Sequence, residues 1–391
     1  MGSRTLDRTQ QTDGAWGIDL GLKSLRIAHL VLDSQGTLEL DLVHKIPYPT
    51  ADKAAASWSD QVHAALSTFA EQNALTAEPI AASVPEFWSL ITYSQVPSLT
   101  DERLRDLVTY EARIQIPLPL EDIVWDYQCF PPTETLPEGE LGMALLALVA
   151  MKVEYLDGLL LAFDRLKSPL EIVQVRSMAM ANMAWHDGIA GPDQGIVGIL
   201  DIGVDESWLT VVNQSRVLRR SVSSSTAAVT AALANSLKLT PQQADAVRRQ
   251  LAPELLTPTV LEALKKPYST LAESAHQAIG LCLKDARCDN LLIVGEGGRL
   301  PLIDRVLNRR LGCPVRPFDA FSNITLSDTL AGKKAQRRGL AAFTPACGLA
   351  LQALGQSYWH MNLLQVDDKA QQVTPSSGKF FSWLGKRRQS G

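Results

Sequence analysis

The sequence predicts an α/β protein with two related lobes that face each other across a cleft. An apolar strand, an Asp-x-Gly turn and a second apolar strand occur twice, in "WGIDLGLKSLRIAHLV" from residue 16 and in "GIVGILDIGVDESWLTVV" from residue 195. A buried strand that runs into a glycine turn and a helix follows in "LLIVGEGGRLPLIDRVL". Two such hairpins indicate a duplicated domain, although spacing alone leaves two ordinary hairpins as an alternative.

The composition is that of a globular protein with more than one domain. The chain has 391 residues, of which 46% are hydrophobic and 20% charged, so we expect two or three cores. A net charge of -5 gives no electrostatic case for binding nucleic acid. The five cysteines are scattered and show no metal-ligand spacing, which favours buried thiols in a reducing compartment. No signal peptide or run of about 18 apolar residues is present, so we expect the chain to stay in the cytoplasm.

The first lobe is expected to open with three strands and a helix. The strands fall between 16 and 46, where "GLKS" and "SQG" provide the turns. A helix is predicted at 58–72, because Val62, Leu66 and Phe69 recur at helical spacing and form one apolar stripe. This stripe is the face that we expect to cover the sheet.

The segment that follows predicts a separate α+β insert. A strand in "WSLITYSQVP" precedes a charged helix in "TDERLRDLVTYEARIQI", which must end before Pro117 and Pro119. The strands "VWDYQCF" and "MALLALVAM", a helix at 153–166 and the strand "LEIVQVR" complete the insert. Met178, Met180 and Met183 then lie on a helix, where core packing is the expected role.

The predicted domain boundaries follow from these elements. They are a flexible N-terminus at 1–15, a first lobe at 16–87 with return helices at 177–193 and 344–355, an insert at 88–176, a second lobe at 194–343 that includes a helical subdomain at 225–287, and a C-terminal tail at 356–391.

The repeated Asp-x-Gly turns indicate a phosphate site. A strand that ends in Asp-x-Gly places a carboxylate at the lip of a sheet, where it can meet a hydrated divalent cation, and the glycine lets backbone amides approach phosphate. The glycines of "VGEGGRL" suit either the close approach of an adenosine or a tight turn at the end of the strand, and a glycine cluster by itself more often forms a plain turn. Together the three segments predict two lobes that hold one nucleotide.

These three segments resemble the phosphate-1, phosphate-2 and adenosine motifs of the actin-like ATPase superfamily, which includes FtsA and MreB. The resemblance implies an actin-like fold with duplicated ribonuclease-H-like lobes around a nucleotide cleft. Within the superfamily, "VPSLTDERLRDLVTYEARIQIPLPLEDIVWDY" is similar to the PilM family of type IV pilus assembly, in which a helix also runs into an Ile-Pro-x-Pro turn. The resemblance covers about residues 16 to 355.

The resemblance implies ATP and Mg²⁺ as ligands. Asp19 and Asp201 would be carboxylates around a water-coordinated Mg²⁺. The other implied nucleotide-binding residues are Gly21, Lys23, Ser24, Gly203, Ser207, Asp245, Arg248, Gly295, Gly297 and Gly298. For Asp245 and Arg248, a solvated helix face is the alternative.

Several residues depart from the pattern of the superfamily. Lys23 stands where relatives usually carry a small hydroxyl residue, and Asp205 and Glu206 add negative charge that Lys23 or a metal would have to offset. Orienting a water for hydrolysis needs a Gln or Glu that "SMAMANMAWHDG" lacks, and Glu86 is a remote substitute. We therefore expect a slow or inactive ATPase.

The tail carries two further predictions. PilM-like proteins bind the cytoplasmic N-terminal peptide of the inner-membrane protein PilN, a peptide that resembles Ile-Asn-Leu-Leu-Pro. Residues 361–365 of "HMNLLQ" resemble it, so they are either an internal mimic or a chance match that caps the final helix. The end of the chain could lie on anionic lipid as an amphipathic helix, and it also resembles the FtsA tail. The residues of that helix are Lys379, Phe380, Phe381, Trp383, Leu384, Lys386, Arg387 and Arg388.

The expected function is therefore an actin-like scaffold at the cytoplasmic face of the inner membrane. It would serve type IV pilus assembly or a related type II secretion machine, bind ATP-Mg and recruit a PilN-like protein, with self-association as a further expectation. Two alternatives stay open: an FtsA-like, membrane-tethered cell-division ATPase, and a degenerate interaction module that binds no nucleotide.

Overall fold

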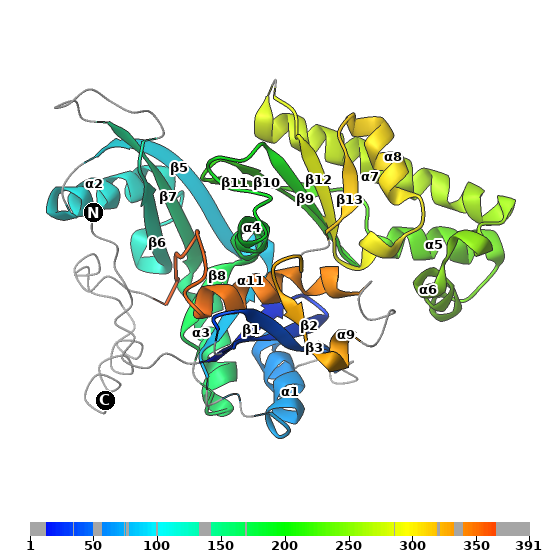
Figure 1. The fold of residues 1–391 in the computed structure, drawn as a ribbon, viewed down its shortest axis with the longest axis horizontal. Helices are drawn as coiled ribbons and strands as arrows, with labels where there is room; N and C mark the ends of the chain where they lie inside the picture. Colours follow the sequence, from blue (N-terminus) through cyan, green and yellow to red (C-terminus); the bar gives the residue numbers. More distant parts are fainter. Residues whose placement is uncertain are drawn as a thin grey trace. The chain divides into compact units, whose positions relative to one another are not determined.

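The chain forms two compact units in the computed structural model (Figure 1). Unit 1 takes Met1–Phe87 and Gly158–His360, and unit 2 takes Trp88–Asp157 and Met361–Gly391. The structure describes residues 13–33, 35–49, 57–73, 75, 78–98, 101–132, 142–168, 170–284, 286–318, 321–331 and 339–364. Residues 1–12 and 365–391 lie outside this part, so the predicted flexible N-terminus and the lipid-binding tail are almost wholly beyond it.

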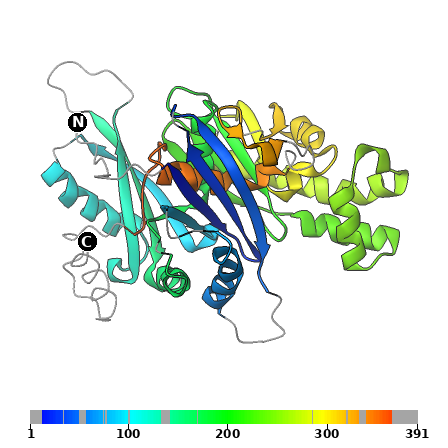
Figure 2. The ribbon, with the colours of Figure 1, turned by 60° about the horizontal axis from the view of Figure 1, so that its bottom comes forward.

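The first lobe of unit 1 is built on a mixed six-stranded sheet. In spatial order its strands are β14 (Thr325–Leu326), β3 (Leu38–Pro47), β2 (Ser24–Leu32), β1 (Gly14–Leu20), β4 (Ile80–Val84) and β8 (Ile172–Val175). The strands β1, β2 and β3 are antiparallel, whereas β4 runs parallel to β1 and β8 parallel to β4. Figure 2 shows this sheet with helix α1 (Trp58–Ala70) beside it.

The central strand β1 is buried along its whole length because helices cover both of its faces. Successive side chains of a strand point to opposite faces. Trp16 meets Phe69 of α1 in an edge-to-face contact with ring centroids 5.7 Å apart. At Gly17, an added Cβ would lie 1.8 Å from the carbonyl oxygen of Ala346 in helix α11 (Thr344–Ala353). The apolar stripe predicted for α1 is therefore confirmed as its buried face.

Helix α11 also packs directly on helix α4 (Arg176–His186). A Cβ at Gly348 would lie 1.8 Å from the carbonyl oxygen of Ala179, so only glycine permits this helix crossing. Met178 and Met183 are fully buried in α4, and the core role expected for the methionines of this segment is confirmed. The two return helices thus close one face of the first sheet.

A buried histidine links three strands of the first lobe. His29 of β2 stacks on Trp16 with ring centroids 4.1 Å apart. Its Nδ1 lies 2.7 Å from Asp41 Oδ1, and its Nε2 lies 2.6 Å from Glu78 Oε2. Burial lowers the pKa of the imidazole, but the hydrogen bonds and charges of the two carboxylates outweigh it and raise the pKa above its ordinary value.

The second lobe repeats the strand order of the first. Its five strands, in spatial order, are β11 (Arg216–Val222), β10 (Ser207–Asn213), β9 (Val197–Ile202), β12 (Asn290–Val294) and β13 (Val315–Pro317). In both sheets three antiparallel strands are followed by two parallel ones, in the order third, second, first, fourth, fifth. The duplication indicated by the two Asp-x-Gly hairpins is therefore a duplication of the whole sheet.

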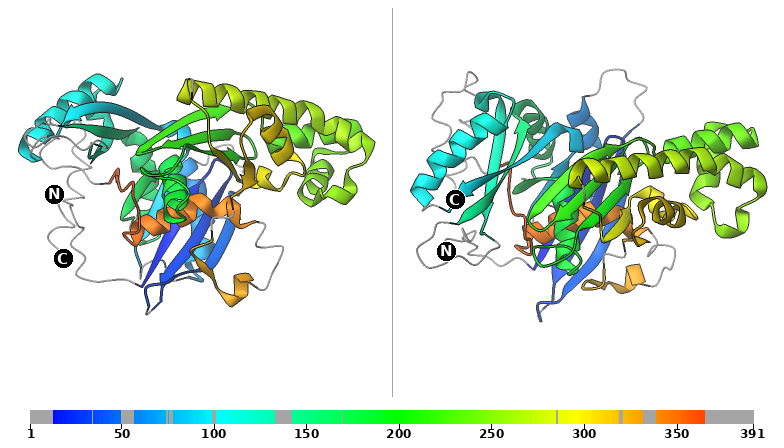
Figure 3. Two further views of the ribbon diagram at one scale, coloured as in Figure 1. Left: turned by 45° about the horizontal axis from the view of Figure 1, so that its top comes forward. Right: turned by 90° about the horizontal axis from the view of Figure 1, so that it is seen from above.

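Helices cover the second sheet and extend from it as a subdomain (Figure 3). They are α5 (Thr226–Leu237), α6 (Pro241–Gln250), the 26-residue α7 (Pro258–Leu283) and α8 (Ile303–Leu311). Thr240 caps α6 with a reciprocal bond to Gln243, and Thr257 caps α7. Leu264 and Leu271 of α7 pack in the same core as β9 and β10. The short helix α9 (Asp328–Ala331) follows β14 in the first lobe.

Unit 2 is a three-stranded antiparallel sheet with a helix on one face. The strands are β5 (Ser89–Pro97), β7 (Met143–Lys152) and β6 (Ile123–Phe130) in spatial order, and α2 (Asp101–Gln115) packs on them. The insert ends earlier than the predicted boundary at residue 176. The strand β8 pairs with β4 in the first lobe, and only the first residues of α3 (Val153–Arg165) belong to unit 2.

Candidate functional site

The two Asp-x-Gly hairpins fold in the same way. Gly21 N donates to Ser24 O at 3.1 Å, and Gly203 N donates to Glu206 O at the same distance. At Gly203 an added Cβ would lie 2.4 Å from that accepting oxygen, so a side chain there would clash with its own turn. The repeated sequence thus encodes a repeated local structure.

Lys23 and Asp205 connect the tips of the two hairpins. Lys23 Nζ donates to Asp205 Oδ1 at 2.6 Å, so the lysine does offset the negative charge of the second turn. The Lys23 side chain is 70% exposed, and such a pair adds little to stability. Glu206, next to Asp205, is partly buried, and burial raises the pKa of its carboxyl group.

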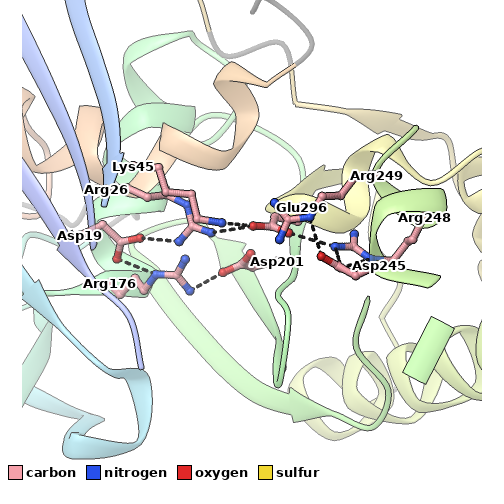
Figure 4. Close-up of polar contacts among 9 residues, drawn as sticks. All are labelled: Asp19, Arg26, Lys45, Arg176, Asp201, Asp245, Arg248, Arg249 and Glu296. Atoms are coloured by element: carbon pink, nitrogen blue, oxygen red, sulfur yellow. Dashed lines mark hydrogen bonds and ion pairs between the residues drawn. The ribbon is translucent and has the colours of Figure 1, made fainter. Parts of the chain in front are cut away.

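The aspartates of the two hairpins share one guanidinium (Figure 4). Asp19 and Asp201 are buried at the ends of β1 and β9, and Arg176 is the first residue of α4. Arg176 Nε donates to Asp19 Oδ1 at 2.8 Å, and its Nη1 donates to Asp201 Oδ2. Burial opposes the charge of Arg176, but the two aspartates outweigh it and raise the pKa of the guanidinium.

This arrangement does not fit the hydrated Mg²⁺ that the resemblance to the actin-like ATPases implied between the two aspartates. A water-coordinated ion needs carboxylate oxygens that accept hydrogen bonds from its waters, whereas Arg176 already occupies an oxygen of each aspartate. The remaining Oδ2 of Asp19 accepts no hydrogen bond from a described residue, but Arg26 Nη1 lies 3.8 Å from it and adds a second positive charge. No group of three or more His, Cys, Asp or Glu side chains in the described ranges is arranged to hold a metal ion.

A second cluster surrounds Glu296 in the glycine turn after β12. Lys45 Nζ donates to Glu296 Oε1, and the guanidinium groups of Arg26 and Arg248 lie 3.9 and 3.4 Å from its carboxylate oxygens. Burial alone would raise the pKa of Glu296, but these cations outweigh it and lower the pKa. Arg248 is buried and also donates to Asp245 Oδ1 at 2.7 Å, so Arg248 does not belong to a solvated helix face, whereas Asp245 stays partly exposed.

The interlobe network is the continuous set of ion pairs formed by both clusters (Figure 4). It carries five cations and four carboxylates. The cations are Arg26, Lys45, Arg176, Arg248 and Arg249, and the carboxylates are Asp19, Asp201, Asp245 and Glu296. The pairs of Arg176 with Asp201 and of Lys45 with Glu296 join one lobe to the other.

The glycine turn brings Glu296 close to the second hairpin. Gly295 has a φ of 78°, and an added Cβ would lie 2.3 Å from Asp201 Oδ1. At Gly297 a Cβ would lie 2.2 Å from Ile202 Cγ2, whereas at Gly298 the nearest atom is 3.5 Å away. Two of the three predicted glycines are therefore needed for packing against β9.

The predicted hydroxyl residues have different surroundings. Ser207 is buried at the start of β10, and its Oγ has no hydrogen-bond partner among the described residues. Thr226 Oγ1, at the start of α5, is likewise buried and without a described partner. Ser24 is half-buried, and its carbonyl oxygen closes the first turn. Buried hydroxyls without partners are unfavourable unless a ligand or water satisfies them.

The remote candidate for orienting a water is engaged elsewhere. Glu86 is buried and pairs with Arg219 of β11, which also donates to its carbonyl oxygen at 2.8 Å. The methionine-rich helix α4, in which a Gln or Glu was sought, begins instead with Arg176, which donates to the two aspartates. The expectation of weak or absent hydrolysis stays a prediction, and the geometry of these residues is consistent with it.

A strap after α11 was not foreseen from the sequence. Gly355, with a φ of 75°, ends the helix, and Gln356 N donates to Leu351 O. Trp359 is then fully buried and donates from Nε1 to Ser215 O at 2.9 Å. Asn182 of α4 accepts from Trp359 N at 2.9 Å and donates to Trp359 O at 2.8 Å. The strap therefore ties α4 of the first lobe to the β10–β11 turn of the second.

In unit 2, the residues that resemble the partner peptide lie on the sheet. The backbone N of Asn362 donates to Asp126 Oδ2 of β6 at 2.7 Å, and Met361 and Leu363 are each 1% exposed. Asp126 lies on the sheet face opposite α2, because its neighbours Trp125 and Tyr127 pack in the α2 core. The segment Met361–Leu364 does not cap α11, since Gly355 and Gln356 already do so. Gln365 lies outside the described residues.

Comparison with known proteins identifies similar chains. The family model "Type IV pilus assembly protein PilM" matches residues 17–354. A structure described as the PilM-PilN type IV pilus biogenesis complex has a TM-score of 0.71 and 19% identity, covering 88% of this chain and 99% of that one. No curated protein matches the sequence.

Two further solved structures share the fold at lower similarity. The ethanolamine utilization protein EutJ from Carboxydothermus hydrogenoformans has a TM-score of 0.50 at 12% identity and covers 86% of this chain and 89% of its own. A diol dehydratase-reactivating factor has a TM-score of 0.53 at 9% identity and covers 88% and 100%. The predicted actin-like fold class is confirmed. No helix in the described part of the chain has the length and apolar character needed to cross a membrane.

Proposed function

Because the chain belongs to the PilM family of type IV pilus assembly proteins, we propose that it is a cytoplasmic scaffold of a pilus or related type II secretion machine. It recruits the N-terminal peptide of a PilN-like protein at the inner face of the inner membrane. The family match over residues 17–354 carries this proposal, and the similar fold of a chain described in a PilM-PilN complex supports it.

We place the recruitment of the peptide on the face of the unit 2 sheet that Met361–Leu364 covers. We call this binding surface the seat. At the seat, Asp126 accepts a hydrogen bond from the backbone N–H of Asn362, and the apolar side chains of Met361 and Leu363 are buried. A peptide with the pattern apolar-Asn-Leu-Leu offers the same groups in the same order. The internal segment is then a competitor that the partner peptide must displace.

A released variant tests the seat without truncating the chain. In it, Met361, Asn362, Leu363 and Leu364 are replaced by Gly, Ser, Gly and Ser, so the competitor is removed. In this background Asp126→Ala should weaken capture of the partner by about tenfold or more, because a hydrogen bond to a charged group contributes about 1.5–3 kcal/mol.

The matched control is Asp122→Ala in the same background, since Asp122 is an exposed carboxylate of the same unit. The measurement is co-purification of the full-length membrane partner in detergent with each variant. Equal capture by the Asp126 and Asp122 variants would rule out Asp126 as part of the seat.

ATP binding at the two hairpins forms a second part of the proposal. The buried hydroxyls of Ser207 and Thr226, and the cations Arg26 and Arg176 beside the two hairpins, support a phosphate-bearing ligand there. A thermal shift with ATP that is lost in Ser207→Val would support it, whereas no shift in the unaltered chain would favour an interaction module that binds no nucleotide. The Thr210→Val variant is a control, since Thr210 is a buried hydroxyl residue farther along the same strand.

Contact with the membrane through residues 379–391 stays a prediction, because these residues lie outside the described part of the chain. Flotation with anionic vesicles, with and without residues 379–391, measures it directly. Equal flotation of the two chains would argue against an amphipathic anchor at this end.

A further inference from the structure

Arg176 stands between the two aspartates that define the repeated motif. Its Nε binds Asp19 at 2.8 Å, and its Nη1 binds Asp201. Both aspartates are almost completely buried, with 0% and 3% of their surface exposed. The guanidinium therefore offsets, from within the chain, one of the two negative charges that would otherwise attract a cation, and Arg26 can offset the other.

The positive charge at this position is permanent. A guanidinium remains protonated in proteins, and the two aspartates raise its pKa further. Arg26, with its Nη1 3.8 Å from Asp19, adds a second positive charge. A divalent ion at the same place would meet both cations at close range and would have to displace Arg176 from its hydrogen bonds.

Donors that suit phosphate oxygens remain at this site. Ser207 Oγ and Thr226 Oγ1 are buried and unpartnered at the second hairpin, where Thr226 N donates to Gly203 O. Guanidinium and hydroxyl groups are ordinary donors to phosphate, and they need no metal to act.

We propose that Arg176 takes the place of a divalent cation in this chain, and that the hairpin site binds the phosphate groups of a nucleotide without a metal ion. The choice of nucleotide as ligand rests on the proposed function. The metal measurement below does not depend on it, so the two can fail separately.

The first experiment measures metal binding by the full chain without nucleotide. Mn²⁺ is titrated and followed by electron paramagnetic resonance. The unaltered chain should show no Mn²⁺ site that depends on Asp201, whereas Arg176→Gln should gain one. Adding Asp201→Asn to that variant should remove the site again. Arg219→Gln, which removes another partly buried arginine that pairs with a carboxylate of the other lobe, is the control and should gain none.

The second experiment compares ATP affinity in excess MgCl₂ with affinity in EDTA, by calorimetry on the full chain. We expect the two values to agree within about threefold. A loss of tenfold or more in EDTA would overturn the proposal, as would a Mn²⁺ site in the unaltered chain that Asp201→Asn abolishes. Absence of ATP binding under both conditions would overturn the phosphate part.

Arg176→Gln leaves two buried carboxylates without their partner and could fail to fold. Circular dichroism checks this, and Arg176→Lys provides a second variant that keeps the charge. The lysine variant should gain no Mn²⁺ site, and a site gained there would contradict the role of the positive charge. If only the unaltered chain folds, its Mn²⁺ titration and its ATP affinities still decide the question.

Discussion

Glu296 is the residue whose removal should most weaken the connection between the lobes. Its carboxylate faces three cations, Lys45, Arg26 and Arg248, whose side chains are 33%, 10% and 3% exposed. Glu296→Gln keeps the shape and most hydrogen bonds but removes the charge, so these cations lose a shared counterion. Removing one partner of a buried ion pair costs about 3–5 kcal/mol. Because Lys45 is partly exposed and the amide still accepts hydrogen bonds, we expect about 2–3 kcal/mol.

Urea denaturation followed by circular dichroism measures this loss as a change in the free energy of unfolding. The matched control is Glu273→Gln, whose carboxylate pairs with Arg310 at 2.7 Å on the surface. That pair is exposed to solvent, which screens its charges, so the control should destabilise the chain much less than Glu296→Gln does. In a double-mutant cycle, Lys45→Met should cost less in the Glu296→Gln background than alone. The reasoning fails if Glu296→Gln destabilises the chain no more than the control.

Three further predictions concern stability. Gly348→Ala places a Cβ 1.8 Å from Ala179 O, so we expect a loss of at least about 3 kcal/mol, measured by urea denaturation, and a loss under 1 kcal/mol would contradict this packing. The pKa of His29 is raised in the folded state, so its contribution is complete below about pH 6.5 and is lost as pH rises through the folded pKa. His29→Gln should therefore flatten the dependence of stability on pH above that value, and an unchanged profile would refute the assignment. Trp359→Phe removes the bond to Ser215 O and part of a buried ring, so the melting temperature should fall, whereas an unchanged value would mean that the strap does not join the lobes.

The sequence was informative where a pattern is local. The strand, turn and strand of each hairpin lie within about 20 residues, and their alternation and glycines are visible in the chain itself. The strand before Gly295 and the helix after it could be read in the same way. Sheet order was not visible, but the repeated motif implied that both lobes would share it, and they do.

The site was less visible because its contacts join distant residues. Lys45 and Glu296 are 251 positions apart, and Arg176 is 157 positions from Asp19. A single arginine after an apolar strand has no periodicity or spacing that marks it. Glu296 stands between the glycines of this turn, and a charged residue at that position is the one local sign in the sequence that the turn serves an ion pair.

The position of β8 shows a similar limit. The strand follows the insert in sequence, and nothing in "LEIVQVR" states which sheet it joins. Tertiary packing determines this pairing: β8 lies parallel to β4 and so completes the sheet of the first lobe. The insert therefore ends within α3 and not at residue 176.

Titration of a labelled peptide containing Ile-Asn-Leu-Leu-Pro tests the central claim most directly. Fluorescence anisotropy would compare the unaltered chain, the released variant and a chain without residues 365–391, which keeps Met361–Leu364. We predict that the released variant binds at least tenfold more tightly than the unaltered chain, and that the chain without residues 365–391 binds like the unaltered one. Equal affinity in all three, or no binding by any of them, would contradict the recruitment of a partner peptide at this seat.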